Sequence, residues 1–87
     1  MSKLKSVEEI MAGWDKLDRP KDGQIFEHYK GGRYEIVGTG YLEDSEALCV
    51  IYRSLEKNII GVRTAKNFLE QVERNGSKVP RFRPLEK

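Results

Sequence analysis

The sequence predicts a mainly β fold, a small and partly open barrel of about five short strands preceded by an N-terminal α-helix. Three observations support this. Apolar residues recur at spacings of three and four over residues 3–18, short runs of period two follow between residues 24 and 82, and glycine-bearing turns separate those runs. The chain has 87 residues, enough for one domain. A sheet of short strands that curls covers a thin core and hides its edges.

Residues 1–21 are expected to form an amphipathic helix and a linker. The apolar positions that share one face are Leu4, Val7, Ile10, Met11, Trp14 and Leu17. Ser6 and Glu9 fit a capping box, so the regular helix should begin at Val7. Gly13 weakens a helix by about 1 kcal/mol relative to alanine, so this helix needs a surface to pack on. The face carrying Met11, Trp14 and Leu17 either closes one end of the barrel or contacts a partner or a second copy.

Residues 22–83 are the predicted barrel domain, and residues 84–87 a tail. The sequence predicts strands over residues 24–29, 34–37, 47–53 and 59–63. Gly31 and Gly32 form a tight turn between the first two strands, because glycine tolerates the positive φ angles of hairpin turns. Gly38 and Gly40 indicate a bulge or a sharp bend.

The segment after the fourth strand allows two interpretations. Thr64 can cap a short helical turn over residues 65–69. The chain then continues either as a longer helix to Arg74 or as a hairpin with strands over residues 70–74 and 78–82. Asn75-Gly76 is a strong hairpin signal, so we expect the hairpin.

Charge and cysteine content limit the classes of function. Sixteen Lys and Arg face fourteen Asp and Glu, a formal charge of +2, which by itself implies no nucleic-acid or membrane partner. Cys49 is the single cysteine, so no intrachain disulfide forms, and its apolar neighbours predict a buried, inert thiol. The sequence shows no signal peptide and no membrane span, and we expect a cytoplasmic protein.

A series of short motifs resembles a known bacterial family. These are His28-Tyr29-Lys30-Gly31-Gly32, Tyr34-Glu35-Ile36-Val37-Gly38, Val50-Ile51-Tyr52-Arg53, Val62-Arg63, Phe68-Leu69-Glu70-Gln71-Val72-Glu73, Asn75-Gly76 and Val79-Pro80-Arg81-Phe82. Their order is similar to that of domain of unknown function 1653, over roughly residues 22–83. The resemblance implies an SH3-like small β-barrel and implies no activity, because that family has no established function.

The sequence departs from the pattern of that family at three places. Gly61 stands where the pattern has a tryptophan before Val-Arg. Arg63-Thr64-Ala65 replaces an Arg-Pro-Leu run, and the acidic segment 42–45 replaces His-Ser-Glu-Thr. If the tryptophan and the histidine line a site elsewhere in the family, that site is weakened in this chain.

The residue types give no catalytic arrangement. His28 is the only histidine and Cys49 the only thiol, so the sequence predicts no metal site and no cofactor. No serine lies in a nucleophile-elbow context, and the glycines lack the Walker pattern. Glu70 and Glu73 are interpreted as solvated surface residues. We expect no enzyme; one would require a pocket with a strongly perturbed titratable group.

Aromatic and cationic residues form the candidate binding surface. They are His28, Tyr29, Lys30, Arg33, Tyr52, Arg53, Arg63, Arg81 and Phe82. Guanidinium groups and aromatic rings bind ligands through bidentate hydrogen bonds and stacking. Each tyrosine is alternatively a wall residue of the barrel, and Arg53 and Arg63 alternatively pair with Glu35 or Glu73.

Two functions follow as expectations. The first is a non-catalytic protein-interaction or adaptor module, with a protein partner or a homodimer. The alternative is a nucleic-acid-binding accessory domain, because residues 74–87 carry five Lys and Arg against Glu86 and place Phe82 between two arginines. For that segment the opposing interpretation is a solvated tail with Phe82 inside the barrel.

Overall fold

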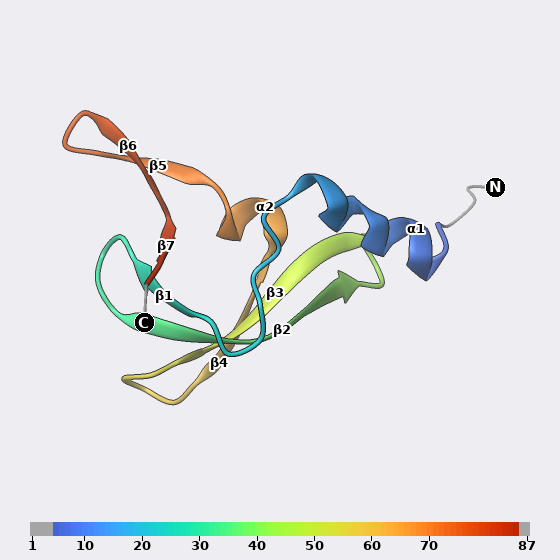
Figure 1. Cartoon of the computed structure of the whole chain (residues 1–87), viewed down its shortest axis with the longest axis horizontal. Helices are drawn as coiled ribbons and strands as arrows, with labels where there is room; N and C mark the ends of the chain where they lie inside the picture. The colour runs from blue at the N-terminus through green and yellow to red at the C-terminus, as the bar shows by residue number, and fades with distance from the viewer. Residues whose placement is uncertain (1–4, 86–87) are drawn as a thin grey trace.

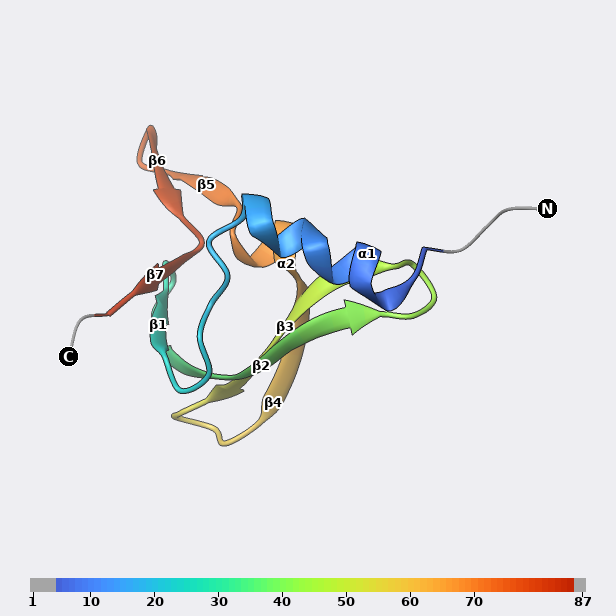
Figure 2. The same cartoon turned by 45° about the vertical axis from the view of Figure 1, so that its right-hand side comes forward.

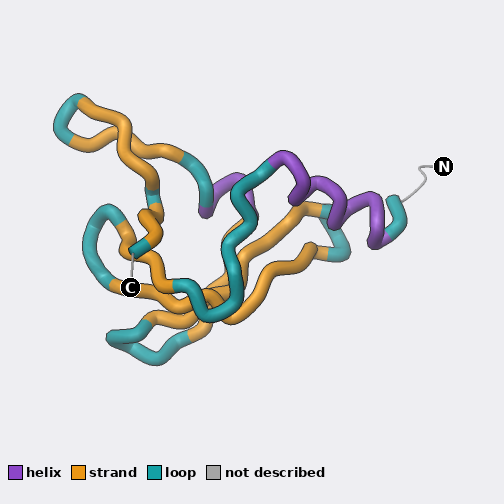
Figure 3. Tube along the Cα trace, viewed as in Figure 1, coloured by secondary structure: helices purple, strands orange, loops and turns teal. Residues whose placement is uncertain are grey.

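The computed structural model describes residues 5–85 and shows a mainly β molecule with a short N-terminal helix (Figure 1; Figure 3). The helices are α1 (Val7–Met11), the 3₁₀ helix η1 (Ala12–Lys16) and α2 (Ala65–Phe68). The strands are β1 (Ile25–His28), β2 (Arg33–Leu42), β3 (Ala47–Ser54), β4 (Ile60–Thr64), β5 (Gln71–Arg74), β6 (Ser77–Pro80) and β7 (Phe82–Pro84). Among residues 5–85, no helix is long and apolar enough to cross a membrane.

The main sheet has five antiparallel strands in the order β4-β3-β2-β1-β7, and β5 and β6 form a separate hairpin. Strands β4 and β7 are the two edges of the main sheet, so within the described residues hydrogen bonds do not close it into a barrel. Figure 2 shows α1, η1 and α2 lying over the concave side of the bent sheet. The helices therefore cover the core that a closed barrel would enclose.

Strand β2 contains a bulge, as predicted, but the bulge lies just before Gly38 and not between Gly38 and Gly40. Its register with β3 shifts between Ile36 and Gly38, which leaves Val37 as the extra residue. Ile36 is buried in the core and Val37 is exposed on the opposite face, as the period-two pattern predicts. The strand nevertheless continues to Leu42, five residues beyond its predicted end, because the bulge bends the strand without ending its pairing with β3.

The N-terminal helix is shorter than predicted. The capping box is confirmed: the Glu9 amide donates to Ser6 Oγ, and the Ser6 amide donates to Glu9 Oε1. After Met11 the chain tightens into the 3₁₀ helix η1, and Leu17 is already extended. At Gly13 a Cβ would lie 3.1 Å from Leu48 Cδ1, so the chain here approaches β3 closely. Leu4 lies outside the described residues.

The C-terminal segment confirms the short helix and the hairpin. The Thr64 hydroxyl accepts from the Asn67 amide and begins α2, and Asn75 and Gly76 both adopt positive φ between β5 and β6. The predicted single strand over residues 78–82 is wrong, however. The chain breaks at Arg81, and β7 leaves the hairpin to pair with β1. The Arg81 amide still donates to the Glu70 carbonyl at 2.9 Å, and beyond this hydrogen bond the chain turns toward β1.

The core lies between the sheet and the helices. Its buried members are Trp14, Phe26, Ile36, Val50, Ala65, Phe68 and Phe82. Phe68 is fully buried, stacks on Phe82 at 4.2 Å between ring centroids, and meets Phe26 edge to face at 5.1 Å. Trp14 brings η1 into this core, and its indole Nε1 has no hydrogen-bond partner among the described residues. Cys49 is buried, as predicted.

Candidate functional site

An aromatic wall continues from the core to the surface along β1, β2, β3 and β7. The ring of His28 meets Phe82 at 4.9 Å and Tyr34 at 6.4 Å between centroids. Tyr34 in turn meets Tyr52 at 5.4 Å, edge to face. Phe82 is buried while His28, Tyr34 and Tyr52 are half-buried, so the wall presents ring edges and polar tips to solvent.

Arg63 lies on this wall. Its guanidinium is 5.2 Å from the centroid of the Phe82 ring. Its Nε donates to the Tyr52 hydroxyl at 3.0 Å, and its Nη1 donates to Asn67 Oδ1 at 2.6 Å. These partners are neutral, so they orient the planar guanidinium without cancelling its charge.

Gly61 makes room for this arrangement. It pairs with Tyr52 across β3 and β4, and a Cβ at Gly61 would lie 2.7 Å from Cε1 of the Tyr52 ring. The Tyr52 ring therefore extends across the bare backbone and brings its hydroxyl to Arg63. In this chain, glycine at position 61 is what permits that contact.

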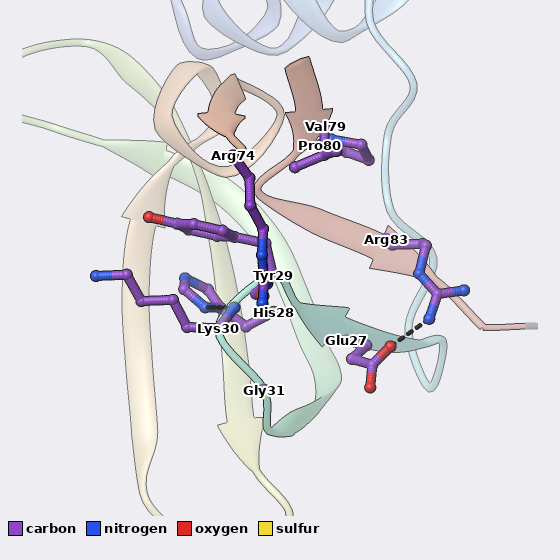
Figure 4. A pocket seen from close by; sticks show the side chains of 9 residues that line it. All are labelled: Glu27, His28, Tyr29, Lys30, Gly31, Arg74, Val79, Pro80 and Arg83. Atoms are coloured by element: carbon purple, nitrogen blue, oxygen red, sulfur yellow. Dashed lines mark hydrogen bonds and ion pairs between the residues drawn. The ribbon is translucent and has the colours of Figure 1, made fainter. Parts of the chain in front are cut away.

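A cleft of about 520 Å³ opens beside the wall, between the β5–β6 hairpin and the β1–β2 turn (Figure 4). Its lining residues are Glu27, His28, Tyr29, Lys30, Gly31, Arg74, Val79, Pro80 and Arg83. Arg74 reaches down from the end of β5 and donates to the Tyr29 carbonyl, which ties the hairpin to β1 (Figure 4). Lys30 lies 5.7 Å from the centroid of the Tyr29 ring.

Cations outnumber carboxylates around this cleft. The ion pairs within residues 5–85 are Arg33 with Glu56, Arg81 with Glu70, and Arg83 with Glu27. Lys30, Arg63 and Arg74 are therefore without a carboxylate partner in the described part of the chain. We call His28, Lys30, Arg63, Arg74 and Arg81 the cationic site.

His28 responds to this excess of positive charge. Partial burial and the nearby charges of Arg63, Arg81 and Lys30, in that order, lower the pKa of its imidazole below the ordinary 6.5. Its Nδ1 accepts a hydrogen bond from the Lys30 amide at 3.1 Å, which requires Nδ1 to be unprotonated. His28 is therefore neutral at pH 7, and the site has no favourable place for a further cation.

This shift predicts a loss of stability on acidification. Because the unfolded chain binds a proton more readily than the folded one, His28 contributes stability that is complete above pH 6.5 and declines as the pH falls toward the lowered pKa. Urea unfolding at pH 5–8 measures this decline. In His28→Asn the amide oxygen can replace Nδ1 as acceptor, and the part of the decline due to His28 should disappear.

The only histidine also reports its own pKa, through its Cε1 proton in NMR spectra. A titration midpoint at or above 6.5 in the folded protein would contradict this account of the site.

The two ends of the molecule differ in charge. The helix segment 5–18 and the β2–β3 turn (residues 42–47) lie together, joined by the Lys5 amide donating to Glu46, and hold seven carboxylates and two lysines. At the opposite end (Figure 1), the β1–β2 turn and residues 71–85 hold five cations and Glu73. The formal charge of +2 thus conceals a strongly polarised surface.

Two of the predicted surface residues lie elsewhere. Arg53 follows Tyr52 on β3 and projects from the opposite face, where its Nη1 contacts Asn58 Oδ1 at 3.4 Å. Arg33 is exposed and pairs with Glu56 at 3.5 Å. The other predicted residues lie along the wall and the cleft: His28, Tyr29, Lys30, Tyr52, Arg63, Arg81 and Phe82.

Most of the apolar face of the predicted interaction helix points into the core. Trp14 is buried in the core and Met11 packs against it, whereas Leu17 is exposed. Sequence reasoning missed two residues of the site. Asn67 positions Arg63 and lies three residues after Thr64, whose capping role the sequence does signal. In the sequence, Arg74 stands out only as one of the five cations of residues 74–87.

Among residues 5–85, no three histidine, cysteine or carboxylate side chains gather as metal ligands would. The site offers hydrogen-bond donors and positive charge. Its chemistry is therefore suited to holding an anion.

Comparison with known proteins gives the family. The model of the family described as "Protein of unknown function (DUF1653)" matches residues 24–84. The crystal structure of a DUF1653 protein from Bordetella bronchiseptica has a similar fold, with a TM-score of 0.66, 23% sequence identity, and coverage of 76% of this chain and 86% of that one. No curated protein matches this chain. The resemblance found in the motifs is therefore confirmed: this chain belongs to the DUF1653 family.

Proposed function

We propose that the protein is a non-catalytic binding module whose cationic site recognises an acidic segment of a partner protein. The observation that carries the proposal is the state of Arg63. Neutral groups hold its guanidinium on an aromatic wall near His28. Neither Arg63 nor Lys30 and Arg74 of the adjoining cleft has a carboxylate partner among the described residues.

Such an arrangement favours an anionic ligand. Like charges held together repel each other, and an anion bound between them removes that repulsion. Arginine binds carboxylates through two parallel hydrogen bonds, and clusters of arginine are a recurring way to recognise acidic motifs. Of the three guanidinium nitrogens of Arg63, Nη2 makes no hydrogen bond within the described residues and remains available to a ligand.

The positions of the rings favour a protein over a single-stranded nucleic acid. Bases bind by stacking on exposed aromatic faces. Phe82, the ring between two arginines, is buried against Phe68, and Tyr34 and Tyr52 pack edge to face within the wall. Tyr29 is the one ring that lines the cleft beyond His28. Charge alone therefore supports a nucleic-acid ligand, whereas a carboxylate-rich segment needs no stacking surface.

Fluorescence anisotropy tests this proposal with labelled probes. A twelve-residue peptide of alternating glutamate and glycine should bind at low salt with an affinity that falls steeply as salt is added. The same peptide with glutamine in place of glutamate is the matched control and should not bind. The proposal is wrong if the two peptides behave alike, or if a labelled oligothymidylate binds more tightly than the acidic peptide.

We also propose that the main sheet is an SH3-like barrel left open between β4 and β7. The five-strand order and the bulge at Val37, which bends β2, support this assignment.

A further inference from the structure

The outer face of the main sheet carries an apolar strip at its edge. Val62 and Ile60 on edge strand β4 are 53% and 48% exposed, and Val62 lies directly beside Ile51 of β3. This strip lies on the face opposite Arg63, so it is separate from the cationic site. An exposed edge strand offers backbone amides and carbonyls that can pair with another strand.

The two edges of the sheet differ in how they are protected. Strand β7 has three residues and carries Arg83 and Pro84, features that discourage further pairing. Strand β4 has five residues with the sequence Ile-Gly-Val-Arg-Thr and contains no proline. Its one charged side chain, Arg63, is held over the inner face by Tyr52 and Asn67. The edge at β4 therefore keeps the features of a strand that pairs.

We propose that β4 pairs with β4 of a second copy, antiparallel and centred on Val62, to form a symmetric dimer. In this register Val62 faces Val62 of the second copy and Ile60 faces Thr64, so the outer side of the contact is free of charge. Arg63, the only charged residue of β4, faces Gly61 on the inner side.

Self-complementarity is what identifies the occupant as a second copy. Moving the centre of symmetry by one residue, to Arg63, would set two arginines directly opposite each other, which is unfavourable. The register centred on Val62 avoids this and also joins the apolar strips of both copies across the contact. Another protein's strand would need its own complementary sequence, whereas β4 already matches itself.

Cysteine cross-linking tests the register. In Val62→Cys the two thiols face each other across the symmetry axis, within the Cα separation of about 4.4–6.8 Å that a disulfide requires. In the matched variant Ile60→Cys the two thiols lie four residues apart along the strands, about 13 Å. Val62→Cys should therefore form a covalent dimer in a glutathione buffer at least tenfold faster than Ile60→Cys. Wild type, whose single Cys49 is buried, should form none.

Sedimentation velocity tests the dimer without a cross-link. Wild type should associate with rising concentration, Val62→Lys should remain monomeric, and Val37→Lys, an equal change at an exposed position away from the edge, should associate like wild type. A wild type that is monomeric at about 200 μM, equal cross-linking of both cysteine variants, or equal loss of association in both lysine variants would each overturn the proposal.

Discussion

Replacing Phe68 by alanine is expected to destabilise the protein by about 3–5 kcal/mol, the range typical of truncating a buried phenylalanine. Its side chain is fully buried, stacks on Phe82 and meets Phe26 edge to face. Because Phe26 lies on β1 and Phe82 on β7, this one ring connects α2 to the strands at one end of the sheet. Alanine would leave a cavity between α2, β1 and β7 and would remove the ring contacts that join them.

A domain of this size has little stability to lose. At roughly 0.05–0.15 kcal/mol per residue, its total free energy of unfolding is about 4–13 kcal/mol. Phe68→Ala should therefore lose a large fraction of the free energy of unfolding, as measured by urea denaturation followed by far-ultraviolet circular dichroism. Ile59→Ala, at a position 61% exposed, is the control and should change the free energy of unfolding by less than about 0.5 kcal/mol. A loss below about 1 kcal/mol for Phe68→Ala would contradict the core described here.

The features that the sequence predicted best depend on residues close together in the chain. Ser6 with Glu9 begins α1, Thr64 begins α2, and Asn75 with Gly76 turns the hairpin. The side chains of Ser6 and Thr64 accept hydrogen bonds from backbone amides three residues further on, and Asn75 and Gly76 tolerate the positive φ of a tight turn. Each of these features therefore depends only on residues close together in the sequence.

The features it missed depend on distant parts of the chain. Just after α1 ends, η1 brings Gly13 close to Leu48, 35 positions away along the sequence. Strand β7 leaves the hairpin because Phe82 pairs with His28 on β1, and no local pattern signals that pairing. The cover that the helices provide over the concave side of the sheet likewise depends on contacts between distant residues, such as those of Trp14 with the core.

The candidate site was predicted only in part, because some of its features depend on neighbouring residues and others on distant parts of the chain. Period-two alternation separates Tyr52 from Arg53, so the sequence alone contained the information that these neighbours lie on opposite faces. The position of Arg63 on Phe82 and its hydrogen bond to Asn67 required α2 and β7 to be in place first. The sequence therefore supplied the residue types of the site, and tertiary packing selected which of them meet.

Replacing Arg63 by methionine should weaken binding of the acidic peptide by about 10- to 100-fold, the effect expected when one charge-assisted, hydrogen-bonded contact is lost. Methionine keeps the apolar contact with Phe82 and removes the charge. Stability should change little, because the half-buried Tyr52 hydroxyl and Asn67 amide can turn to water. The pKa of His28 should rise toward its ordinary value, since Arg63 is the leading charged group that lowers it.

Arg53→Met is the matched control for this prediction, because it removes the same charge from the opposite face of β3. It should leave the pKa of His28 unchanged and weaken peptide binding by less than about threefold, the scale of a screened surface charge. Anisotropy titrations and the NMR titration of His28 measure both quantities on each variant. Equal weakening by the two substitutions would mean that peptide binding depends only on net charge, and the assignment of Arg63 to a specific site would be wrong. Weakened binding in Arg63→Met alone, together with a raised His28 pKa, would show that the charge on which peptide binding depends is the one that lies near His28.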